Sequence, residues 1–312
     1  SFAPDHLVPS TALIWFYPGP DAPATLRPVS RIGIAGLQLD LPRGDNLDRF
    51  DREIDSVRKR FPWVHLVVIG ELGVFGPDPA LAQSLPGPAE ARFCEAARRN
   101  GLWLVPGSLF ERHGDCIYNT APVIDPAGRV VARYRKMFPF YPYERGVTPG
   151  SEFVVFDIPG VTRVGVSICY DMWFPETTRT LAWLGAEVIV HPTMTNTIDR
   201  DVELSIARAS AATNQCYFVD INVAGDLGFG RSGLFGPGGE KLHEAGSGRE
   251  VLAAELDLAA VRAARERGWC GLTQPLKSFR DSKLRFPPYT EGHDRSPALQ
   301  ALGPLTMPQI DK

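Results

Sequence analysis

The stretch that decides the fold runs from residue 164 to residue 176 and reads VGVSICYDMWFPE. Its first five residues form a short apolar run, which is typical of a buried strand. Cys169 follows this run directly, and Pro175 suits the first turn of a helix because its fixed φ angle is already helical. The stretch therefore predicts a strand, a sharp turn with a thiol at the bend, and a helix.

Outside this stretch, short apolar runs alternate with longer segments of helical spacing. In residues 47–57 the apolar side chains recur at helical spacing behind Asp45 and Asn46, either of which can cap the start of a helix. Such alternation predicts an α/β fold, in which helices cover mixed sheets. The predicted strands are residues 32–38, 66–70, 102–105, 130–134, 164–168, 188–191 and 217–222.

The composition is that of an ordinary globular enzyme. Of the 312 residues, 44% are hydrophobic and 22% are charged, which excludes a disordered chain. The formal net charge of −3 leaves no excess of basic side chains for phosphate backbones, so we expect no nucleic-acid partner. The longest apolar runs are far shorter than the roughly 20 residues that cross a bilayer, so we expect no membrane partner. Five cysteines, an odd number without paired spacing, favour a reducing compartment and predict a cytoplasmic location.

We predict one main domain, residues 31–284, between two proline-rich ends. Residues 1–30 are predicted to form an extended N-terminal extension. Residues 285–312 contain five prolines and too few apolar side chains for a core of their own. This C-terminal tail therefore needs a docking surface, which a partner subunit could supply.

Three residues that can carry chemistry follow predicted strands. Glu71 and Lys136 come directly after apolar runs, as Cys169 does, and ligands bind beyond the carboxyl ends of strands in open α/β sheets. A thiol has an ordinary pKa of about 8.5, so it needs a base or a positive charge to become a good nucleophile. Glu71 can be that base, while Lys136 and the backbone N–H of Tyr170 can stabilise an oxyanion. The alternatives are an inert buried thiol and two solvated charges at strand ends.

Four stretches resemble the nitrilase, or carbon–nitrogen hydrolase, superfamily, whose catalytic residues are Glu, Lys and Cys. The resemblance covers about residues 31–280 and implies an α-β-β-α sandwich and a homo-oligomer built from dimers. The four stretches are VVIGELGVFG (67–76), YNTAPVIDPAGRVVARYRK (118–136), GVSICYDMWFPE (165–176) and SGLFGPGGEKLHEAG (232–246).

The segment after the lysine, YRKMFPFYPYERGVTPG (134–150), is similar to the lysine loop of aliphatic amidases. The resemblance implies that Glu144, eight residues after Lys136, positions the lysine or the substrate nitrogen. The alternative for Glu144 is a surface salt bridge with Arg145 or Arg135. We therefore place the chain in the amidase-like branch of the superfamily.

Two departures from the family bear on the substrate. Relatives that act on N-carbamoyl amino acids or ω-amides carry an arginine just after the cysteine, where this chain has Met172 and Trp173. An indole cannot neutralise a carboxylate, so we expect a small neutral or apolar amide. True nitrilases usually have Trp-Glu after the cysteine, and Tyr170-Asp171 here favours amides over nitriles. The candidate walls of the substrate pocket, each of which can instead be a core residue, are Trp173, Phe140, Tyr141 and Tyr143.

Other motifs carry little chemistry. Residues 228–233 satisfy G-x-G-x-x-G, but LFGPGG follows and cannot open the helix of a dinucleotide site, so we predict a loop and hairpin. The six histidines are scattered without metal-ligand spacing, and we predict no metal and no cofactor. His191 can face the pocket or pack at a strand end. Asn222 and the other four cysteines are assigned to backbone and core packing.

The sequence thus predicts a thiol amidohydrolase in which Cys169 attacks an amide carbonyl and Glu71 moves the proton. Four alternatives within enzymes stay open: hydrolysis of N-carbamoyl amino acids or ω-amides, nitrile hydrolysis, acyl transfer to an amine or hydroxylamine, and a Cys169–His191 hydrolase. An inactive binding or assembly module is the alternative outside enzymes.

Overall fold

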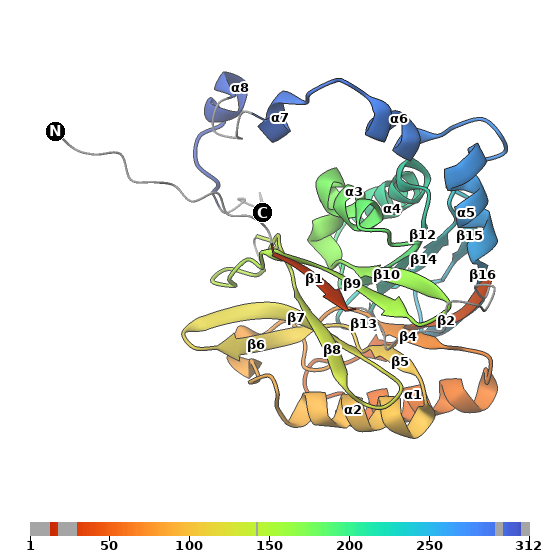
Figure 1. Ribbon diagram of the computed structural model, residues 1–312. Helices are drawn as coiled ribbons and strands as arrows, with labels where there is room; N and C mark the ends of the chain where they lie inside the picture. The colour runs from red at the N-terminus through yellow and green to blue at the C-terminus, as the bar shows by residue number, and fades with distance from the viewer. Residues whose placement is uncertain (1–12, 18–29, 142, 291–295, 307–312) are drawn as a thin grey trace.

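A computed structural model describes residues 13–17, 30–141, 143–290 and 296–306. Two β-sheets pack face to face, and pairs of helices cover their outer faces, which makes four layers (Figure 1). In the first sheet the strands follow the order β1 (Leu13–Tyr17), β9 (Glu152–Ile158), β10 (Thr162–Val166), β11 (Val188–Thr193), β12 (Tyr217–Asn222), β14 (Gly233–Phe235) and β15 (Lys241–Glu244).

The second sheet is also mixed, with a core of parallel strands and antiparallel strands on either side. Its strand order is β16 (Glu250–Asp257), β2 (Arg31–Gln38), β4 (Leu66–Ile69), β5 (Trp103–Val105), β7 (Cys116–Ile124) and β6 (Leu109–His113), and β8 (Val130–Arg135) also pairs with β7. Two short strands, β3 (Asp40–Leu41) and β13 (Ala224–Gly225), pair with each other.

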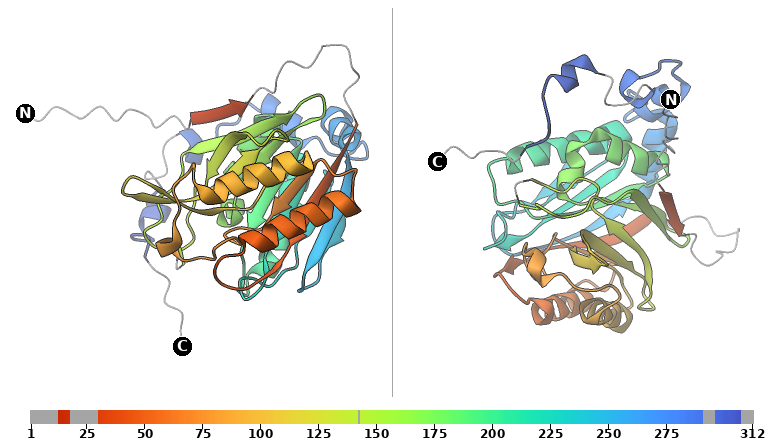
Figure 2. Two further views of the ribbon diagram at one scale, coloured as in Figure 1. Left: turned by 90° about the horizontal axis from the view of Figure 1, so that it is seen from below. Right: turned by 90° about the vertical axis from the view of Figure 1, so that its left-hand side faces the viewer.

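Helices α1 (Leu47–Arg60) and α2 (Pro88–Asn100) lie side by side on the second sheet, and α3 (Pro175–Trp183) and α4 (Arg200–Asn214) cover the first (Figure 2). Helix α5 (Leu258–Arg267) follows β16. Three short helices then lead along the C-terminal segment: α6 (Pro275–Asp281), α7 (Pro287–Thr290) and α8 (Pro297–Gln300). Two 3-10 turns complete the described elements, η1 (Pro79–Leu81) and η2 (Cys169–Trp173).

Strand alternation sorts the apolar side chains into three cores, because successive residues of a strand point to opposite faces. In β11, Val188 and Val190 join the core between the two sheets, whereas Ile189 joins the core under α3 and α4. Trp103 stacks on Phe156 across the two sheets, with ring centroids 5.3 Å apart. The third core lies between the second sheet and helices α1 and α2. These layers confirm the predicted α-β-β-α sandwich.

The predicted helix after Asp45 is α1, whose N-cap position is Asn46, although the Asn46 side chain does not cap the helix. Asp45 accepts a hydrogen bond from the backbone N–H of Leu47 through Oδ1 at 2.9 Å. Asn46 instead donates from its side chain to backbone carbonyls, including that of Gly73 at 3.0 Å. The predicted hairpin after the glycine-rich loop is formed by β14 and β15.

The predicted N-terminal extension and C-terminal tail are each described in part, and part of the extension belongs to the first sheet. Residues 13–17 of the predicted N-terminal extension form β1, which pairs in parallel with β9, while the rest of residues 1–29 lies outside the described part. In the described part of the predicted tail, the Tyr289 hydroxyl of α7 donates to Glu176 of α3 at 3.0 Å, whereas α8 extends away from the body of the protein (Figure 1) and Leu302 and Leu305 are exposed. None of the described helices is long and apolar enough to cross a bilayer.

Candidate active site

The ends of three strands bring Glu71, Lys136 and Cys169 together in the interior. Glu71 lies just beyond β4, Lys136 just beyond β8, and Cys169 begins the η2 turn after β10. The Nζ atom of Lys136 is 2.8 Å from Oε1 of Glu71 and 2.6 Å from Oε2 of Glu144. Only 1% of Lys136 and 6% of Cys169 is exposed. The structure thus assembles the residues that the sequence singled out.

The contacts of Glu144 decide between its two interpretations. Its carboxylate binds the Lys136 ammonium and also accepts the backbone N–H of Phe140 at 2.6 Å. Arg135, one of the surface partners considered for it, pairs with Glu111 at 2.6 Å instead. Glu144 therefore faces the lysine and not the surface.

Asn119 is a site residue that the sequence reasoning missed. Its side-chain amide nitrogen donates to Oε1 of Glu71 at 2.8 Å and to Oε1 of Glu144 at 2.7 Å. Both hydrogens of the amide are therefore used to hold the two carboxylates in place. The signal in the sequence was the position of Asn119 at the start of the family-like stretch 118–136, where it is a polar residue ahead of the apolar residues 121–124. The structure places it in β7.

The Lys136 side chain is arranged to donate one further hydrogen bond. An ammonium has three hydrogens, and two of them point to Glu71 and Glu144. Burial alone would lower the pKa of Lys136, but the carboxylates of Glu144 and Glu71 outweigh it and hold that pKa well above its usual value. Lys136 is therefore charged at neutral pH, and its third N–H can stabilise negative charge on a bound carbonyl oxygen.

The carboxylate of Glu71 is set up to accept a proton. Burial and the nearby Glu144 carboxylate raise the pKa of Glu71, whereas Lys136 and a hydrogen bond from Cys169 lower it. Its second oxygen, Oε2, accepts the backbone N–H of Met194 at 2.9 Å. A carboxylate with a raised pKa beside a thiol is the arrangement of a general base.

Cys169 lies at a strained bend. Its φ angle is 45°, in the left-handed region that a residue with a side chain rarely adopts. The predicted strand 164–168 lies two residues too late, because β10 runs from Thr162 to Val166 and the chain then turns into η2. Burial and the Glu71 carboxylate raise the pKa of Cys169 well above its usual value, opposed by Lys136. The thiol is therefore protonated until a base removes its proton.

Asp171 connects the cysteine turn to the lysine strand. Its Oδ2 accepts the backbone N–H of Ile168 at 2.9 Å and the hydroxyl of Tyr134 at 2.6 Å, and Oδ1 accepts the N–H of Phe138 at 3.0 Å. Burial raises the pKa of Asp171 to about 6, although these hydrogen bonds and Lys136 oppose the rise. Asp171 thereby holds the two halves of the site in register.

The burial of His191 favours the second of its two interpretations, a histidine packed at a strand end. The ring is fully buried, with Nδ1 2.7 Å from the Ser167 hydroxyl and Nε2 3.1 Å from the Cys169 carbonyl oxygen. Burial lowers the pKa of His191 to about 4, so the ring is neutral at pH 7. Since a carbonyl only accepts, Nε2 must carry the hydrogen. His191 is the packed histidine at a strand end and supports the nucleophile's backbone.

Aromatic rings connect the cysteine turn to the lysine loop. The Tyr170 ring lies 5.0 Å from Phe140 and 6.1 Å from Trp173, measured between centroids. Tyr143 is 49% exposed beside Phe140, and Tyr141 is also exposed. Trp173 packs against the core under α3 and α4, and its buried Nε1 has no hydrogen-bond partner among the described residues. The core interpretation of Trp173 therefore holds for part of its surface.

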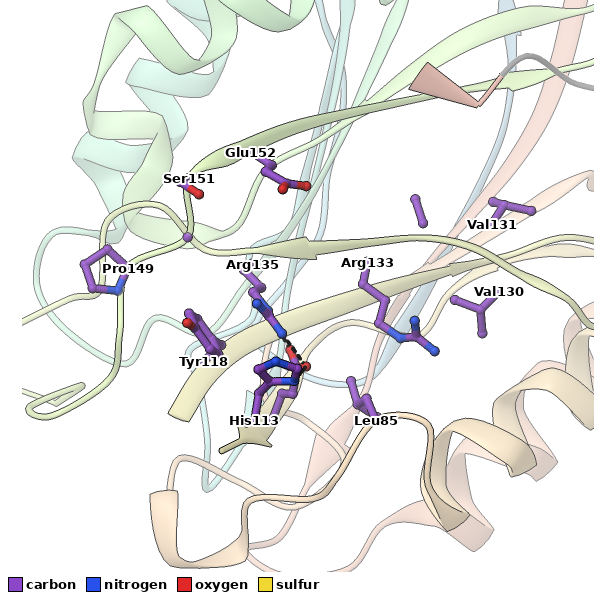
Figure 3. Close-up of a pocket in the computed structure, with 13 residues that line it drawn as sticks. Leu85, His113, Tyr118, Val130, Val131, Arg133, Arg135, Pro149, Ser151 and Glu152 are labelled. Carbon is purple, nitrogen blue, oxygen red and sulfur yellow. Dashed lines mark hydrogen bonds and ion pairs between the residues drawn. The ribbon is translucent and has the colours of Figure 1, made fainter. Parts of the chain in front are cut away.

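A separate hollow of about 360 Å³ lies on the other side of the β7–β8 ribbon (Figure 3). Tyr118 and Arg135 line it, whereas their chain neighbours Asn119 and Tyr134 make hydrogen bonds on the catalytic side. Alternation along the strands thus separates the hollow from the site. The described part of the chain holds no group of three or more His, Cys, Asp and Glu side chains that could bind a metal ion.

Known proteins share this arrangement of the chain. Residues 32–266 match the family model described as carbon-nitrogen hydrolase. The omega-amidase NIT2 of Xenopus tropicalis is 30% identical over 204 residues, which cover 61% of this chain and 74% of that protein. The mouse omega-amidase NIT2 is 27% identical over 256 residues, covering 76% and 92% of the two chains.

Solved structures show the same fold. Saccharomyces cerevisiae Nit3, of branch 10 of the nitrilase superfamily, superimposes with a TM-score of 0.71 at 26% identity over 78% of this chain and 96% of that one. The amidase of Nesterenkonia sp. AN1 gives a TM-score of 0.67 at 27% identity over 76% and 99%. Because the family match extends over the strands that carry Glu71, Lys136 and Cys169, this chain belongs to the carbon–nitrogen hydrolase family and is an amidase-type hydrolase.

Proposed function

We propose that this protein is a thiol amidohydrolase that cleaves the C–N bond of small neutral amides through a thioester on Cys169. One observation carries the proposal: the Lys136 ammonium, bound to Glu71 and Glu144 and buried with them, keeps one N–H free near the thiol. A buried cation with a spare donor, a base and a nucleophile are the groups that acyl transfer from an amide requires.

In the first half-reaction the Cys169 sulfur attacks the amide carbonyl carbon, and Glu71 takes the thiol proton. The carbonyl oxygen becomes negative and is held by Lys136 and by the N–H of Tyr170, which lies in the first turn of η2 and so has no partner within that turn. Glu71 then passes the proton to the nitrogen as the C–N bond breaks. Ammonia or an amine leaves, and the acyl group stays on sulfur.

In the second half-reaction water attacks the thioester, and Glu71 acts as the base. The carbon–sulfur bond breaks, the carboxylic acid leaves, and Glu71 returns the proton to the Cys169 sulfur. If an amine or hydroxylamine took the place of water, the same steps would give acyl transfer. Glu144 and Asn119 hold Glu71 and Lys136 at their working distances throughout.

The preference for neutral amides rests on the absence of a free cation where relatives place one. Trp173 occupies the position after the cysteine where we expect an arginine in relatives that bind carboxylates. The buried Arg200 cannot supply the missing charge, because it is bound to Glu203 and Asp220. The amidase of Nesterenkonia sp. AN1 has been solved in complex with acrylamide and with butyramide, both neutral amides, which supports the same substrate class here.

A second candidate substrate class is ω-amides, on which the NIT2 relatives act by name. One observation favours it: Arg145, next to Glu144, is exposed and makes no ion pair with any residue that the structure describes. A substrate with a carboxylate at its far end could reach this guanidinium from the site.

An ammonia-release panel tests the proposal. It contains acetamide, propionamide, benzamide, phenylacetamide, glutaramate, an N-carbamoyl amino acid and a matching nitrile. We expect neutral amides to be the best substrates, and mass spectrometry of the quenched enzyme to find an acyl group on Cys169. Ammonia release without any modification of Cys169, or no release from any member, would contradict the proposed function.

We further propose a cytoplasmic homo-oligomer built from dimers. All the cysteines are free, as expected of a reducing compartment. The described part of the C-terminal segment exposes Leu284, Leu302 and Leu305, each at least 75% accessible, and such side chains favour burial against another surface. A second copy of the chain would supply that surface.

A further inference from the structure

The backbone segment that holds Glu71 is itself held by buried charges. Met194 donates its N–H to Oε2 of Glu71, as described above. The residues on either side of it, Thr193 and Thr195, are both buried threonines. The Thr193 hydroxyl donates to Oδ1 of Asp220 at 2.8 Å, and the Thr195 hydroxyl donates to Oε1 of Glu203 at 3.0 Å. Each neighbour of Met194 is thus tied to a different carboxylate.

Arg200 joins these two carboxylates. Its Nη1 lies 3.0 Å from Oε2 of Glu203, and its Nη2 lies 2.7 Å from Oδ2 of Asp220. Nη2 also donates to the carbonyl of Arg231 at 2.9 Å. All three charged residues are at most 2% exposed. We call Arg200, Glu203 and Asp220 the buried triad.

The buried triad is not explained by stability alone. Taking charges out of water costs several kcal/mol for each ion, and well-packed apolar side chains are often as stable as a buried ion pair. What such a group does supply is one defined geometry, because each of the four carboxylate oxygens of Glu203 and Asp220 has a specific partner. Here the geometry that it defines is that of residues 193–195.

Backbone contacts carry this geometry to the site. The carbonyl of Thr193 accepts the N–H of Glu71 at 3.1 Å, so the same segment binds both the backbone and the side chain of Glu71. The N–H of Thr195 donates to Oδ1 of Asn222 at 2.8 Å. Residues 193–195 are therefore fixed on one side by the buried triad and Asn222, and on the other side they fix Glu71.

We infer that the buried triad is a positioning device for the general base: through the two threonine hydroxyls it sets the Met194 N–H that directs the Glu71 carboxylate toward Cys169. The inference deepens the proposed function and rests on Glu71 acting as the base. Arg200, Glu203, Asp220, Thr193 and Thr195 are positioning residues, because they act on the reaction only through Met194.

The electrostatics are consistent with this arrangement. Burial raises the pKa of Glu203 to about 7, opposed by Arg200 and reinforced by Asp220. The Glu203 charge in turn contributes to the raised pKa of Cys169, after burial and Glu71. The groups that face Glu71 are Lys136, Glu144 and Cys169, so a displaced Glu71 carboxylate changes its interaction with all three.

Removing a single hydroxyl tests the inference. Thr195→Val keeps the shape of the side chain but removes the donor to Glu203, whereas Thr195→Ser keeps the donor. We expect Thr195→Val to lower kcat about tenfold with KM little changed, because a small displacement of a catalytic group costs rate and not binding. We also expect the acidic limb of the kcat/KM profile to move to higher pH, since a carboxylate that loses an N–H donor holds its proton more tightly.

Two controls accompany this variant. Thr195→Ser should restore both kcat and the pH profile. Thr213→Val removes an exposed hydroxyl of α4 that donates to the carbonyl of Ala209 and accepts from the Asn214 side chain, and it should leave both quantities unchanged. Thermal unfolding of each variant separates a positioning role from a structural one, because lost stability alone would lower the Tm without moving the pH profile.

The pH dependence of iodoacetamide alkylation at Cys169 gives a readout that does not need turnover. If Glu71 is displaced, the alkylation profile of Thr195→Val should also move relative to the parent. An unchanged profile and unchanged kcat in folded Thr195→Val would overturn the inference. A parent protein that releases no ammonia, but whose alkylation profile moves in Thr195→Val, would count against the proposed function and leave the positioning role supported.

Discussion

Lys136 and Glu144 lie eight residues apart in one loop, and their side chains meet at 2.6 Å in the protein interior, each almost fully buried. A buried ion pair of this kind is costly unless its geometry is good, and removing one partner leaves an uncompensated charge. The conformation of this loop therefore depends on both residues. The orientation of the Lys136 ammonium depends on two carboxylates, those of Glu144 and Glu71.

We expect Glu144→Gln to lower kcat by at least about tenfold, because Lys136 loses a charged partner that aims its ammonium. Loss of one buried partner should also destabilise the fold by about 3 kcal/mol. Steady-state ammonia release and chemical denaturation measure the two effects. Glu266→Gln, which neutralises an exposed carboxylate on α5, is the matched control and should change neither. Parent-like turnover in Glu144→Gln would show that Glu71 alone orients the lysine.

Cys169→Ala should abolish turnover and leave the fold intact, because the reaction needs the sulfur whereas the substitution removes only that one atom from the core between the two sheets. Residual activity above about a tenth of the parent rate would be incompatible with a covalent intermediate on this residue.

Lys136→Ala should cost about 10² or more in rate through loss of the oxyanion donor. In Glu71→Gln, an acyl-enzyme that accumulates and is detected by mass spectrometry would show that Glu71 serves the second half-reaction.

The buried His191 should make the folded state sensitive to acid. Its pKa falls from 6.5 to about 4 on folding, so the unfolded chain binds more protons between these values. The stability that neutral His191 contributes is complete above pH 6.5 and is lost as the pH falls toward 4, by up to about 3 kcal/mol. Urea denaturation at several pH values should show a smaller loss over this window in His191→Gln than in the parent. An equal loss in both proteins would show that His191 is protonated in the folded state.

Substrate preference should follow the aromatic residues near the cysteine turn. Each methylene of an acyl chain that is buried against them should stabilise the transition state by up to about 0.8 kcal/mol, which raises kcat/KM roughly fourfold. Trp173→Arg should weaken this trend and improve the use of glutaramate relative to neutral amides. Its Tm must be measured as well, because Trp173 also packs against the core under α3 and α4.

The opposite preference has its own test. If the parent uses glutaramate better than every neutral amide, the argument from Trp173 is wrong. Arg145→Gln should then raise the KM for glutaramate and leave that for propionamide unchanged.

Light scattering should return a mass well above the 34.2 kDa of one chain at micromolar concentration. A variant that ends at residue 284 should shift toward smaller species, because it lacks the exposed Leu302 and Leu305. A parent that is fully active at the mass of one chain would contradict the proposed oligomer.

Local patterns in the sequence determined most of the fold. Period-two and helical spacing of apolar residues depend only on neighbours in the chain, so they predicted the strands around Val68, Val166 and Val190 and the helix α1. They did not predict the end of β10, which lies at Val166 instead of residue 168. The Ile168 N–H donates to the Asp171 side chain and not to a neighbouring strand, so the strand ends two residues before its predicted end.

The candidate site divides in the same way. Glu71, Lys136 and Cys169 stand at the ends of predicted strands and inside family-like stretches, so the sequence alone predicted them as site residues. Their partners were decided only by the tertiary structure: Asn119 is 48 residues from Glu71, and Met194 is 123 residues from it. Contacts over such separations depend on how two sheets pack, and no local spacing records that packing. For the same reason no signal in the sequence indicated that Arg200 lies between Glu203 and Asp220, which only the fold brings together.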